Sequence, residues 1–227
     1  MVITPGWIKV CGLRDVASAK AAVHAGAAAI GINFFTKSPR IVTLTDAAEI
    51  VSALSATSAR PIGLFVNHSR DEIESITAQS GLTTIQFHGD ETPVFVADLH
   101  QRHPDWAILK AFRVGDSLQP VAGFLAECNR LNVPLAGCLL DARVDGSFGG
   151  TGAVAPWELI ACDYDRTNWP PLILAGGLTP DNVAAAIKAV RPMGVDTASG
   201  VESSPGVKDT KLLARFVAEA QRAFAKT

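Results

Sequence analysis

The sequence predicts an α/β protein folded as a single (β/α)8 barrel that spans residues 1–227. Eight short apolar segments recur along the chain, and each is followed by a longer segment with the apolar spacing of a helix. The short segments consist mainly of Ile, Val, Leu and Ala, which is typical of strands buried on both faces of a parallel sheet. No linker or shift of composition divides the chain into parts. We therefore expect one domain.

Each short apolar segment is expected to be a strand, in the order Ile8–Cys11, Ala28–Ile32, Ile62–Val66, Thr84–Phe87, Ala107–Phe112, Ala136–Leu140, Leu172–Leu174 and Gly194–Thr197. The segments between them are expected to be helices, in the order Val16–Ala25, Leu44–Ala56, Arg70–Ser80, Thr92–Arg102, Val121–Leu131, Pro156–Ala161, Asp181–Ala189 and Thr210–Ala225. Thr179 suits the cap of the seventh helix and Pro180 its first turn. Right-handed crossovers between eight parallel strands can close a barrel, whereas a doubly wound sheet carries its glycines after the first strand. The glycine-rich turns of this chain come late, which favours the barrel.

The composition indicates a small-molecule partner. The formal net charge is −2 and 19% of the residues are charged, so no excess of Lys or Arg is present to bind nucleic acid or a membrane surface. The four cysteines are widely spaced, which favours reduced thiols over disulfides or a zinc site. The first residues do not have the build of a signal peptide, and no apolar run reaches the roughly 18 residues of a membrane helix. We expect a cytoplasmic protein.

Two turns near the end of the chain are candidates for a phosphate site. Gly176 and Gly177 follow the seventh predicted strand, and Ser199 and Gly200 follow the eighth. Glycine turns before helices expose backbone N–H groups that bind anions, and (β/α)8 barrels commonly hold phosphate after their last two strands. A short extra helix over Ser199–Ser203 would add to this site. A single turn of this kind more often only changes the direction of the chain. Two such turns near the end of an alternating α/β chain favour a phosphate-binding site.

Cys11 is the candidate general base. It ends the first predicted strand and is followed by Gly12, so its sulfur can point into the mouth of the barrel. Lys9 lies on the same face of the strand and can supply a positive charge that lowers the pKa of the thiol. By itself a buried cysteine is more often a small apolar residue. The assignment of Cys11 as a general base therefore depends on which residues stand at the ends of the other strands.

Asp141 is the candidate general acid. It directly follows the sixth predicted strand and precedes a glycine-rich loop that contains Gly150. Such a loop over the mouth of a barrel is typical of a lid that excludes water, and a carboxyl group beneath it can have a raised pKa. An aspartate at this kind of junction can also do no more than accept the hydrogen bonds of a turn.

Other polar residues at strand ends are candidates for substrate binding. Arg40 follows a proline, and its planar guanidinium matches a carboxylate with two parallel bonds. Spacing alone leaves it equally compatible with a solvated loop arginine. Gln86 and His88 share one face of the fourth strand and need polar partners, and Asp196 ends the eighth strand. His100 and His103 are three residues apart, and we favour a helix C-terminus over a metal pair for them.

Eight motifs together resemble the phosphoribosylanthranilate isomerase family of tryptophan biosynthesis. They are KVCG (9–12), FFTKSPR (34–40), GLFVN (63–67), QFHGDE (86–91), LLDAR (139–143), GGTG (149–152), LAGGLTPDNV (174–183) and VDTASGVESSPGVKD (195–209). The resemblance covers nearly the whole chain. It implies a (β/α)8 barrel with no metal and no organic cofactor. It also implies an Amadori rearrangement of N-(5-phosphoribosyl)anthranilate to 1-(2-carboxyphenylamino)-1-deoxyribulose 5-phosphate.

The resemblance also implies roles for individual residues. The general base of the family falls on Cys11, the general acid on Asp141, and the arginine that holds the anthranilate carboxylate on Arg40. His88 and Asp196 match residues in supporting roles. The phosphate loops fall on Gly176, Gly177, Ser199 and Gly200, with help from the turn that contains Gly150.

Two competing hypotheses remain at the level of the sequence. A histidine-pathway aminoribose isomerase on a similar barrel would generally rely on paired aspartates rather than on a thiol like Cys11. A barrel that only binds a phosphorylated ligand would need the glycine turns but neither Cys11 nor Asp141. The sequence leaves open whether the chain is a monomer or a homodimer.

Overall fold

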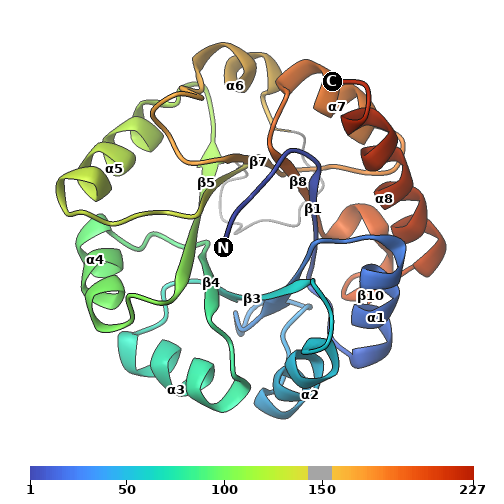
Figure 1. Cartoon of the computed structure of the whole chain (residues 1–227), viewed down its shortest axis with the longest axis horizontal. Coiled ribbons are helices and arrows are strands. Elements are labelled where there is room, and N and C mark those ends of the chain that lie inside the picture. Colours follow the sequence, from blue (N-terminus) through green and yellow to red (C-terminus); the bar gives the residue numbers. More distant parts are fainter. Residues whose placement is uncertain (143–154) are drawn as a thin grey trace.

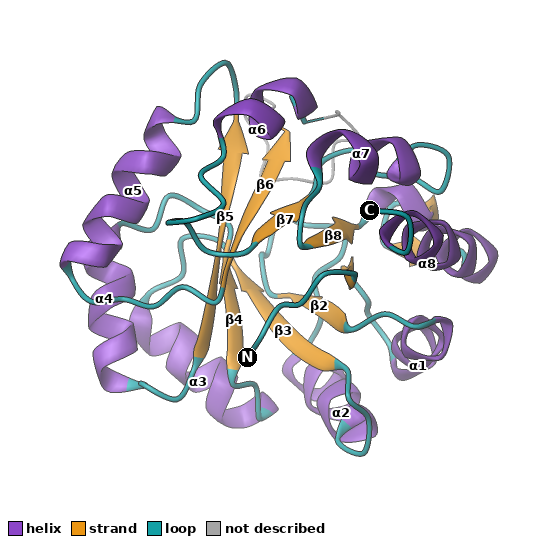
Figure 2. Cartoon of the chain, turned by 45° about the horizontal axis from the view of Figure 1, so that its top comes forward, coloured by secondary structure: helices purple, strands orange, loops and turns teal. Residues whose placement is uncertain are grey.

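The structure, a computed structural model, describes residues 1–142 and 155–227 and confirms the barrel. Its eight parallel strands close in sequence order, and the helices surround them (Figures 1 and 2). The barrel strands are β1 (Trp7–Cys11), β2 (Ala29–Asn33), β3 (Arg60–Phe65), β4 (Thr84–Phe87), β5 (Ala107–Val114), β6 (Gly137–Ala142), β7 (Leu172–Leu174) and β8 (Gly194–Thr197). The helices are α1 (Val16–Ala25), α2 (Leu44–Leu54), α3 (Arg70–Ser80), α4 (Pro93–Arg102), α5 (Gln119–Arg130), α6 (Trp157–Asp163), α7 (Val183–Val190) and α8 (Thr210–Phe224).

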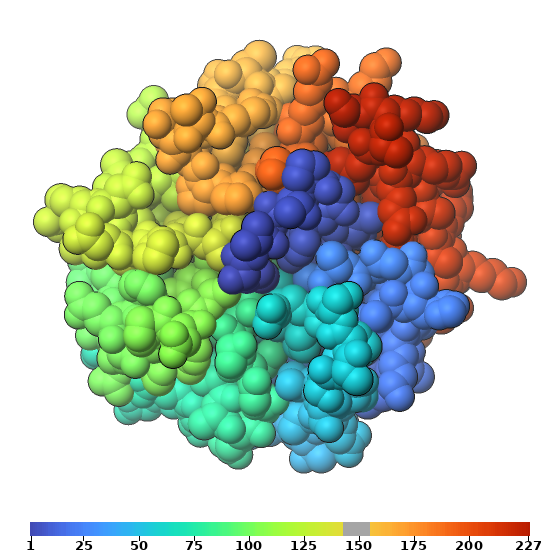
Figure 3. All heavy atoms as spheres, viewed as in Figure 1, coloured from blue at the N-terminus to red at the C-terminus, as the bar shows by residue number. Residues whose placement is uncertain are grey.

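The alternation of side chains along each strand separates two apolar layers. On β1, Ile8 and Val10 point outward into the large cluster between strands and helices. Trp7 points inward into a smaller cluster at the amino-terminal end of the barrel, which also contains Ile3. Figure 3 shows the N-terminal segment, in dark blue, lying across the middle of this end. Apolar packing therefore closes one end of the barrel and leaves the carboxyl ends of the strands for polar groups.

Local sequence explains where several helices begin. Thr43 and Ser69 cap α2 and α3, and each forms a reciprocal capping box with an acidic residue three positions later. Asp15 caps α1, and Gly26 ends it in the left-handed conformation that favours glycine.

Among the described residues, no helix is both long and apolar enough to cross a lipid bilayer.

The structure corrects the prediction at two places near the end of the chain. The seventh helix begins at Val183 rather than at Asp181, because Thr179 and Asn182 bond within a preceding turn. The extra helix expected over Ser199–Ser203 is a shorter 3-10 turn, η1 (Ser199–Val201). It leads into a hairpin, β9 (Glu202–Ser204) and β10 (Val207–Lys208), which the sequence analysis did not predict.

An ion-pair cluster on the outside of the barrel ties α3 to the end of α4. Arg102 Nε and Nη2 donate to the two carboxylate oxygens of Glu74 at 2.7 and 2.9 Å. His103, the C-terminal cap of α4 as predicted, lies 2.8 Å from Glu74 and stacks on Trp106. Hydrogen bonds from Arg102 and then His103 lower the pKa of Glu74 from its ordinary value to about 2.

This depressed pKa predicts a pH-dependent contribution of Glu74 to stability. The contribution should be complete above about pH 4.5 and be lost as the pH falls through about 2, because the unfolded chain then binds the proton more readily. Glu74→Gln should therefore lower Tm at pH 6 by roughly 1–4 °C and much less at pH 2.5. Thermal unfolding followed by circular dichroism at both pH values measures this. An equal Tm difference at both would contradict the assignment.

Candidate active site

Cys11 is held at the carboxyl end of β1 by its neighbour on β2. Cys11 and Gly31 are register partners, and a Cβ atom at position 31 would lie only 2.5 Å from Cys11 Sγ. The sulfur therefore occupies space that exists because residue 31 is glycine. The Cys11 side chain is almost fully buried at 5% exposure. Gly12, with φ of 77°, turns the chain away directly after it.

Lys9 points into the barrel on the same face of β1 as Cys11 and meets Asp196 on β8. The two are register partners, and Lys9 Nζ lies 3.0 Å from Asp196 Oδ1 with both side chains buried. Burial by itself lowers the pKa of Lys9, but Asp196 and Cys11 outweigh it and raise that pKa above its ordinary value. Burial raises the pKa of Asp196 above its ordinary value, although Lys9 acts to lower it. We describe them as an ion pair, because an unpaired charge inside the barrel would cost several kcal/mol.

The pKa of Cys11 is set by burial and by the charges around it. Lys9 does act to lower it, as predicted, and so does Lys208, which the sequence analysis missed. Burial is the larger effect, however, and the charge of Asp196 adds to it, so the pKa of Cys11 is raised above its ordinary value. Cys11 is consequently a thiol at neutral pH when no ligand is bound.

Asp141 lies at the carboxyl end of β6, beside His88, which directly follows β4. Asp141 Oδ2 is 3.4 Å from His88 Nε2, and Gln86 Nε2 lies 3.1 Å from the other ring nitrogen of His88. The second carboxylate oxygen of Asp141 accepts a hydrogen bond from the N–H of Ala142 at 2.8 Å. Gly176 is needed next to it, since a Cβ there would lie 2.9 Å from this same oxygen. The structure thus brings Asp141, His88 and the first glycine turn together.

Asp196 connects the two groups of residues electrostatically. Asp196 is within electrostatic range of Asp141 and of Cys11. All three residues stand at the carboxyl ends of strands in one closed parallel barrel, so they belong to one mouth. Asp141 is 7% exposed and His88 is 6% exposed, so both side chains are largely shielded from water.

A buried network fixes the loop that follows His88. Lys110 Nζ donates to the carbonyl oxygen of Gly89 at 2.7 Å and contacts Glu91 Oε2 at 3.1 Å. The other carboxylate oxygen of Glu91 accepts a hydrogen bond from the N–H of Asn67 at 2.8 Å. The loops after β3 and β4 are thereby tied to β5, and the loop after His88 is held in place.

Arg40 is buried rather than solvated, at 9% exposure. Its Nε and Nη2 donate to the two carboxylate oxygens of Glu202, both at 2.8 Å. Glu202 also accepts a hydrogen bond from Lys208 Nζ at 2.8 Å. Neither Glu202 nor Lys208 was predicted from the sequence. The motif GVESSPGVK does contain a signal for them, because an acidic and a basic residue flank the turn residues Ser-Pro-Gly.

The two glycine turns come together at the carboxyl ends of β7 and β8. Gly176 and Gly177 have φ of 83° and 62°, and within the described residues neither N–H donates to a protein acceptor. Thr197 Oγ1 donates to the carbonyl oxygen of Leu178 at 2.8 Å. A Cβ at Gly200 would lie 1.9 Å from this carbonyl oxygen, so only glycine allows the turns to approach so closely. The partly exposed backbone of both turns is suited to an anion.

Gly150 and the rest of the predicted lid lie outside the described residues. In residues 1–142 and 155–227, no three His, Cys, Asp or Glu side chains are grouped in a way that could hold a metal ion.

The closed parallel barrel, with its buried charged groups collected at the carboxyl ends of the strands, defines the protein as a (β/α)8-barrel enzyme. The model of the N-(5'-phosphoribosyl)anthranilate (PRA) isomerase family matches residues 8–219. This chain therefore belongs to the PRA isomerase family.

Individual relatives agree with this assignment. An N-(5'-phosphoribosyl)anthranilate isomerase of Stutzerimonas stutzeri is 46% identical over 209 residues, which are 92% of this chain and 94% of the relative. The solved structure of phosphoribosyl anthranilate isomerase from Thermotoga maritima is 31% identical with a TM-score of 0.81, covering 98% of this chain and 100% of that one. Another, in complex with reduced 1-(o-carboxyphenylamino)-1-deoxyribulose 5-phosphate, is 30% identical with a TM-score of 0.79 and the same coverage. The family match decides against the histidine-pathway hypothesis.

The raised pKa of Cys11 predicts how its reactivity depends on pH. Cys11 should be almost entirely thiol at pH 7, so alkylation by iodoacetamide should be slow there and its rate should keep rising beyond pH 9. Mass spectrometry of the alkylated peptides over a pH series measures this for each cysteine. Exposed Cys162 provides the reference rate within the same molecule. A rate for Cys11 that levels off below pH 8 would show that the cations outweigh burial.

Proposed function

We propose that this protein catalyses the Amadori rearrangement of N-(5-phosphoribosyl)anthranilate in tryptophan biosynthesis, with Cys11 as general base and Asp141 as general acid. The observation that carries the proposal is that Cys11 and Asp141 stand at the carboxyl ends of β1 and β6 in one closed parallel barrel, in a chain of the PRA isomerase family. A thiol and a carboxyl group from strands on different sides of the barrel are thus placed around one mouth. The product is 1-(2-carboxyphenylamino)-1-deoxyribulose 5-phosphate.

Asp141 acts in the first step, the opening of the sugar ring. It donates a proton to the ring oxygen while the bond from this oxygen to C1 breaks, and the nitrogen lone pair forms a C1=N double bond. The positively charged iminium that results makes the hydrogen on C2 acidic. His88, 3.4 Å from Asp141, and the N–H of Ala142 hold the carboxyl group in place for this transfer.

Cys11 acts in the second step. Its thiolate removes the proton from C2, the electron pair of this bond forms a C1=C2 double bond, and the nitrogen becomes neutral. The enolamine then gains a proton at C1 and loses one from the C2 hydroxyl group, which gives the ketone. The rearrangement moves hydrogen within the substrate and needs no electron acceptor.

The raised pKa of Cys11 is compatible with this role because Asp141, once it has given its own proton to the ring oxygen, is a carboxylate that can accept the proton of the thiol. In the free protein Cys11 is favoured as a thiol. A positively charged iminium beside the sulfur lowers the pKa of the thiol, in addition to the effects of Lys9 and Lys208. The thiolate is therefore favoured when the iminium is present. Before that stage the sulfur carries its proton and is protected from side reactions.

Substrate binding is assigned to the two ends of the mouth. The backbone N–H groups of Gly176, Gly177, Ser199 and Gly200 are suited to the phosphate, and the Arg40 guanidinium to the anthranilate carboxylate. General acid and general base catalysis contribute on the order of 10²–10⁴-fold each, so positioning by these two anchors has to supply much of the remaining acceleration.

The assembly and the location of the protein belong to the same proposal. One neighbouring structure is described as that of generated monomers of the dimeric phosphoribosylanthranilate isomerase from Thermotoga maritima, with a TM-score of 0.76. We accordingly keep monomer and homodimer as the two forms to be distinguished, for which sedimentation is decisive. The four cysteines are all free, which supports a reducing, cytoplasmic location.

Substitution of the acid or the base tests the catalytic roles. Cys11→Ser and Asp141→Asn should each lower kcat by about 10²–10⁴-fold, because each removes one proton-transfer group. Inorganic phosphate should bind both variants as it binds the original protein, since the glycine turns are unchanged. Steady-state conversion of the substrate and calorimetric titration with phosphate measure the two effects.

Cys162→Ser and Asp163→Asn carry the same chemical changes at exposed positions on α6 and serve as matched controls. Full activity of either site variant would remove its assigned role. Binding of phosphate without any conversion by the original protein would favour the hypothesis of a barrel that only binds a ligand.

A further inference from the structure

The hairpin of β9 and β10 adds two charged side chains to the mouth of the barrel. Glu202 and Lys208 are register partners across the hairpin, and their side chains are 4% and 2% exposed. The hairpin packs against the loop that carries Arg40, because a Cβ at Gly206 would lie 2.5 Å from the carbonyl oxygen of Pro39. Elements from opposite ends of the chain therefore meet at Arg40.

Glu202 binds only one edge of the Arg40 guanidinium. The Nε and Nη2 atoms donate to the two oxygens of Glu202 at 2.8 Å each, which uses two of the five N–H donors of the group. A guanidinium has a second edge, formed by Nη1 and Nη2, that can make another pair of parallel bonds. The aliphatic part of Arg40 packs on Gly12, where a Cβ would lie 2.4 Å from Arg40 Cδ. The aliphatic stem of Arg40 and the Nε–Nη2 edge of its guanidinium are thus both held in place.

The charges around Glu202 leave a net positive site. Burial by itself raises the pKa of Glu202, but the hydrogen bonds from Arg40 and Lys208 outweigh it and hold that pKa below its ordinary value. Glu202 is therefore a carboxylate between two cations. Burial lowers the pKa of Lys208, and the hydrogen bond with Glu202 acts against this. With Lys208 protonated, the three groups carry one net positive charge in a part of the protein shielded from water, which is complementary to an anionic ligand.

Lys208 connects this cluster to the second phosphate turn. Its Nζ donates to the carbonyl oxygen of Ala198 at 2.8 Å, directly before Ser199 and Gly200, as well as to Glu202. Glu202 is consequently linked on one side to the group assigned to the substrate carboxylate and on the other side to the backbone assigned to its phosphate.

We propose that Glu202 is a positioning residue for substrate recognition, which holds the Nε–Nη2 edge of Arg40 and so directs the Nη1–Nη2 edge to the carboxylate of the substrate. This inference rests on the proposed function, since it needs Arg40 to bind that carboxylate. Glu202 itself does not touch the substrate. Glu202 holds the long Arg40 side chain in one orientation before the ligand binds. Little rotational freedom of Arg40 is therefore lost on binding.

The test uses Glu202→Gln in the full-length chain. The amide puts an N–H group against the N–H groups of Arg40 and so breaks one of the two bonds. The dissociation constant of reduced 1-(o-carboxyphenylamino)-1-deoxyribulose 5-phosphate should rise about tenfold, and KM should rise with it, while kcat changes less than about threefold. The dissociation constant of inorganic phosphate should stay within about twofold.

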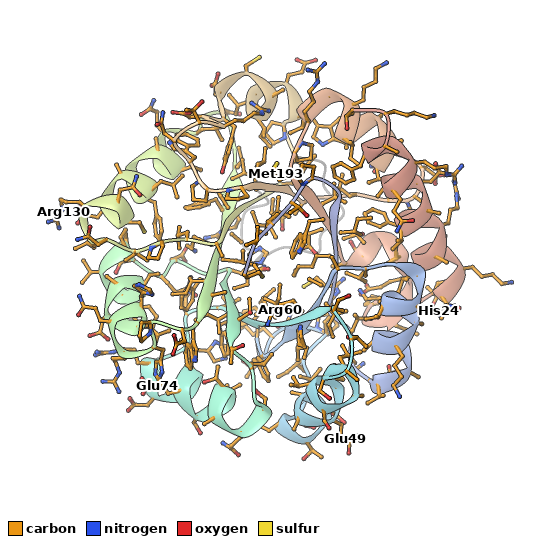
Figure 4. All side chains as sticks on the ribbon, viewed as in Figure 1. His24, Glu49, Arg60, Glu74, Arg130 and Met193 are labelled. Atoms are coloured by element: carbon orange, nitrogen blue, oxygen red, sulfur yellow. The ribbon has the colours of Figure 1, made fainter. Side chains whose placement is uncertain are left out.

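Glu74→Gln is the matched control, because Glu74 also binds an arginine through both carboxylate oxygens but lies on the outside of the barrel (Figure 4). It should change none of these constants. Arg40→Ala should itself raise the dissociation constant of the reduced analogue and KM. In the Arg40→Ala background, Glu202→Gln should cause little further loss, because the positioned group is gone.

Three results would overturn the inference while the proposed function stands. The reduced analogue could bind tighter to Glu202→Gln, which would mean that Glu202 competes with the substrate for Arg40. The loss could be the same with and without Arg40, which would place the effect elsewhere. If Glu202→Gln does not fold, Glu202→Asp, which keeps the charge but is one methylene shorter, should bind the analogue more weakly, and unchanged binding would reject the inference. Absence of both conversion and analogue binding in the original protein would instead reject the proposed function, and the inference with it.

Discussion

The ion pair between Lys9 and Asp196 joins the first and the last strand at the place where the barrel closes. The two residues are register partners on β1 and β8, and both are buried. Two charges removed from water cost several kcal/mol each unless they are paired closely, so any displacement of one strand relative to the other is penalised. The same contact holds a cation two residues from Cys11 and an anion within range of Asp141. Closure of the fold and assembly of the site thus depend on one interaction.

The other buried charged side chains at the mouth of the barrel are also paired with opposite charges. Lys110 with Glu91 holds the loop after His88, and Arg40 with Glu202 and Lys208 holds the opposite side of the mouth. Inside the barrel, apolar side chains such as Ile3 and Trp7 fill the amino-terminal end. Polar atoms gather at the other end, where backbone N–H groups after the strands are available to a ligand. A site rich in paired charges can bind an anionic substrate at both of its ends and still exclude water from the reacting carbons.

Much of the site could be located from the sequence because its residues stand at predictable places. Cys11, Asp141 and Asp196 each follow a run of apolar residues, and the carboxyl ends of parallel strands meet at one end of a barrel. The glycine turns were visible from their spacing. Glu202 and the hairpin were not, since the partner of Glu202 is 162 residues away and three-residue strands have little periodicity to detect. The direction of the Cys11 pKa could not be predicted either, because it depends on burial as well as on the nearby lysine.

The sequence by itself determined the order of the eight barrel strands and their helices, the closure into a barrel, and the identity of the residues at the ends of these strands. These follow from local periodicity and from the geometry that parallel strands share. Only the tertiary structure decided which charges pair and how they act on the thiol. Pairing and burial depend on distances of a few ångströms between segments far apart in the chain, and electrostatic energy inside a protein varies steeply over those distances.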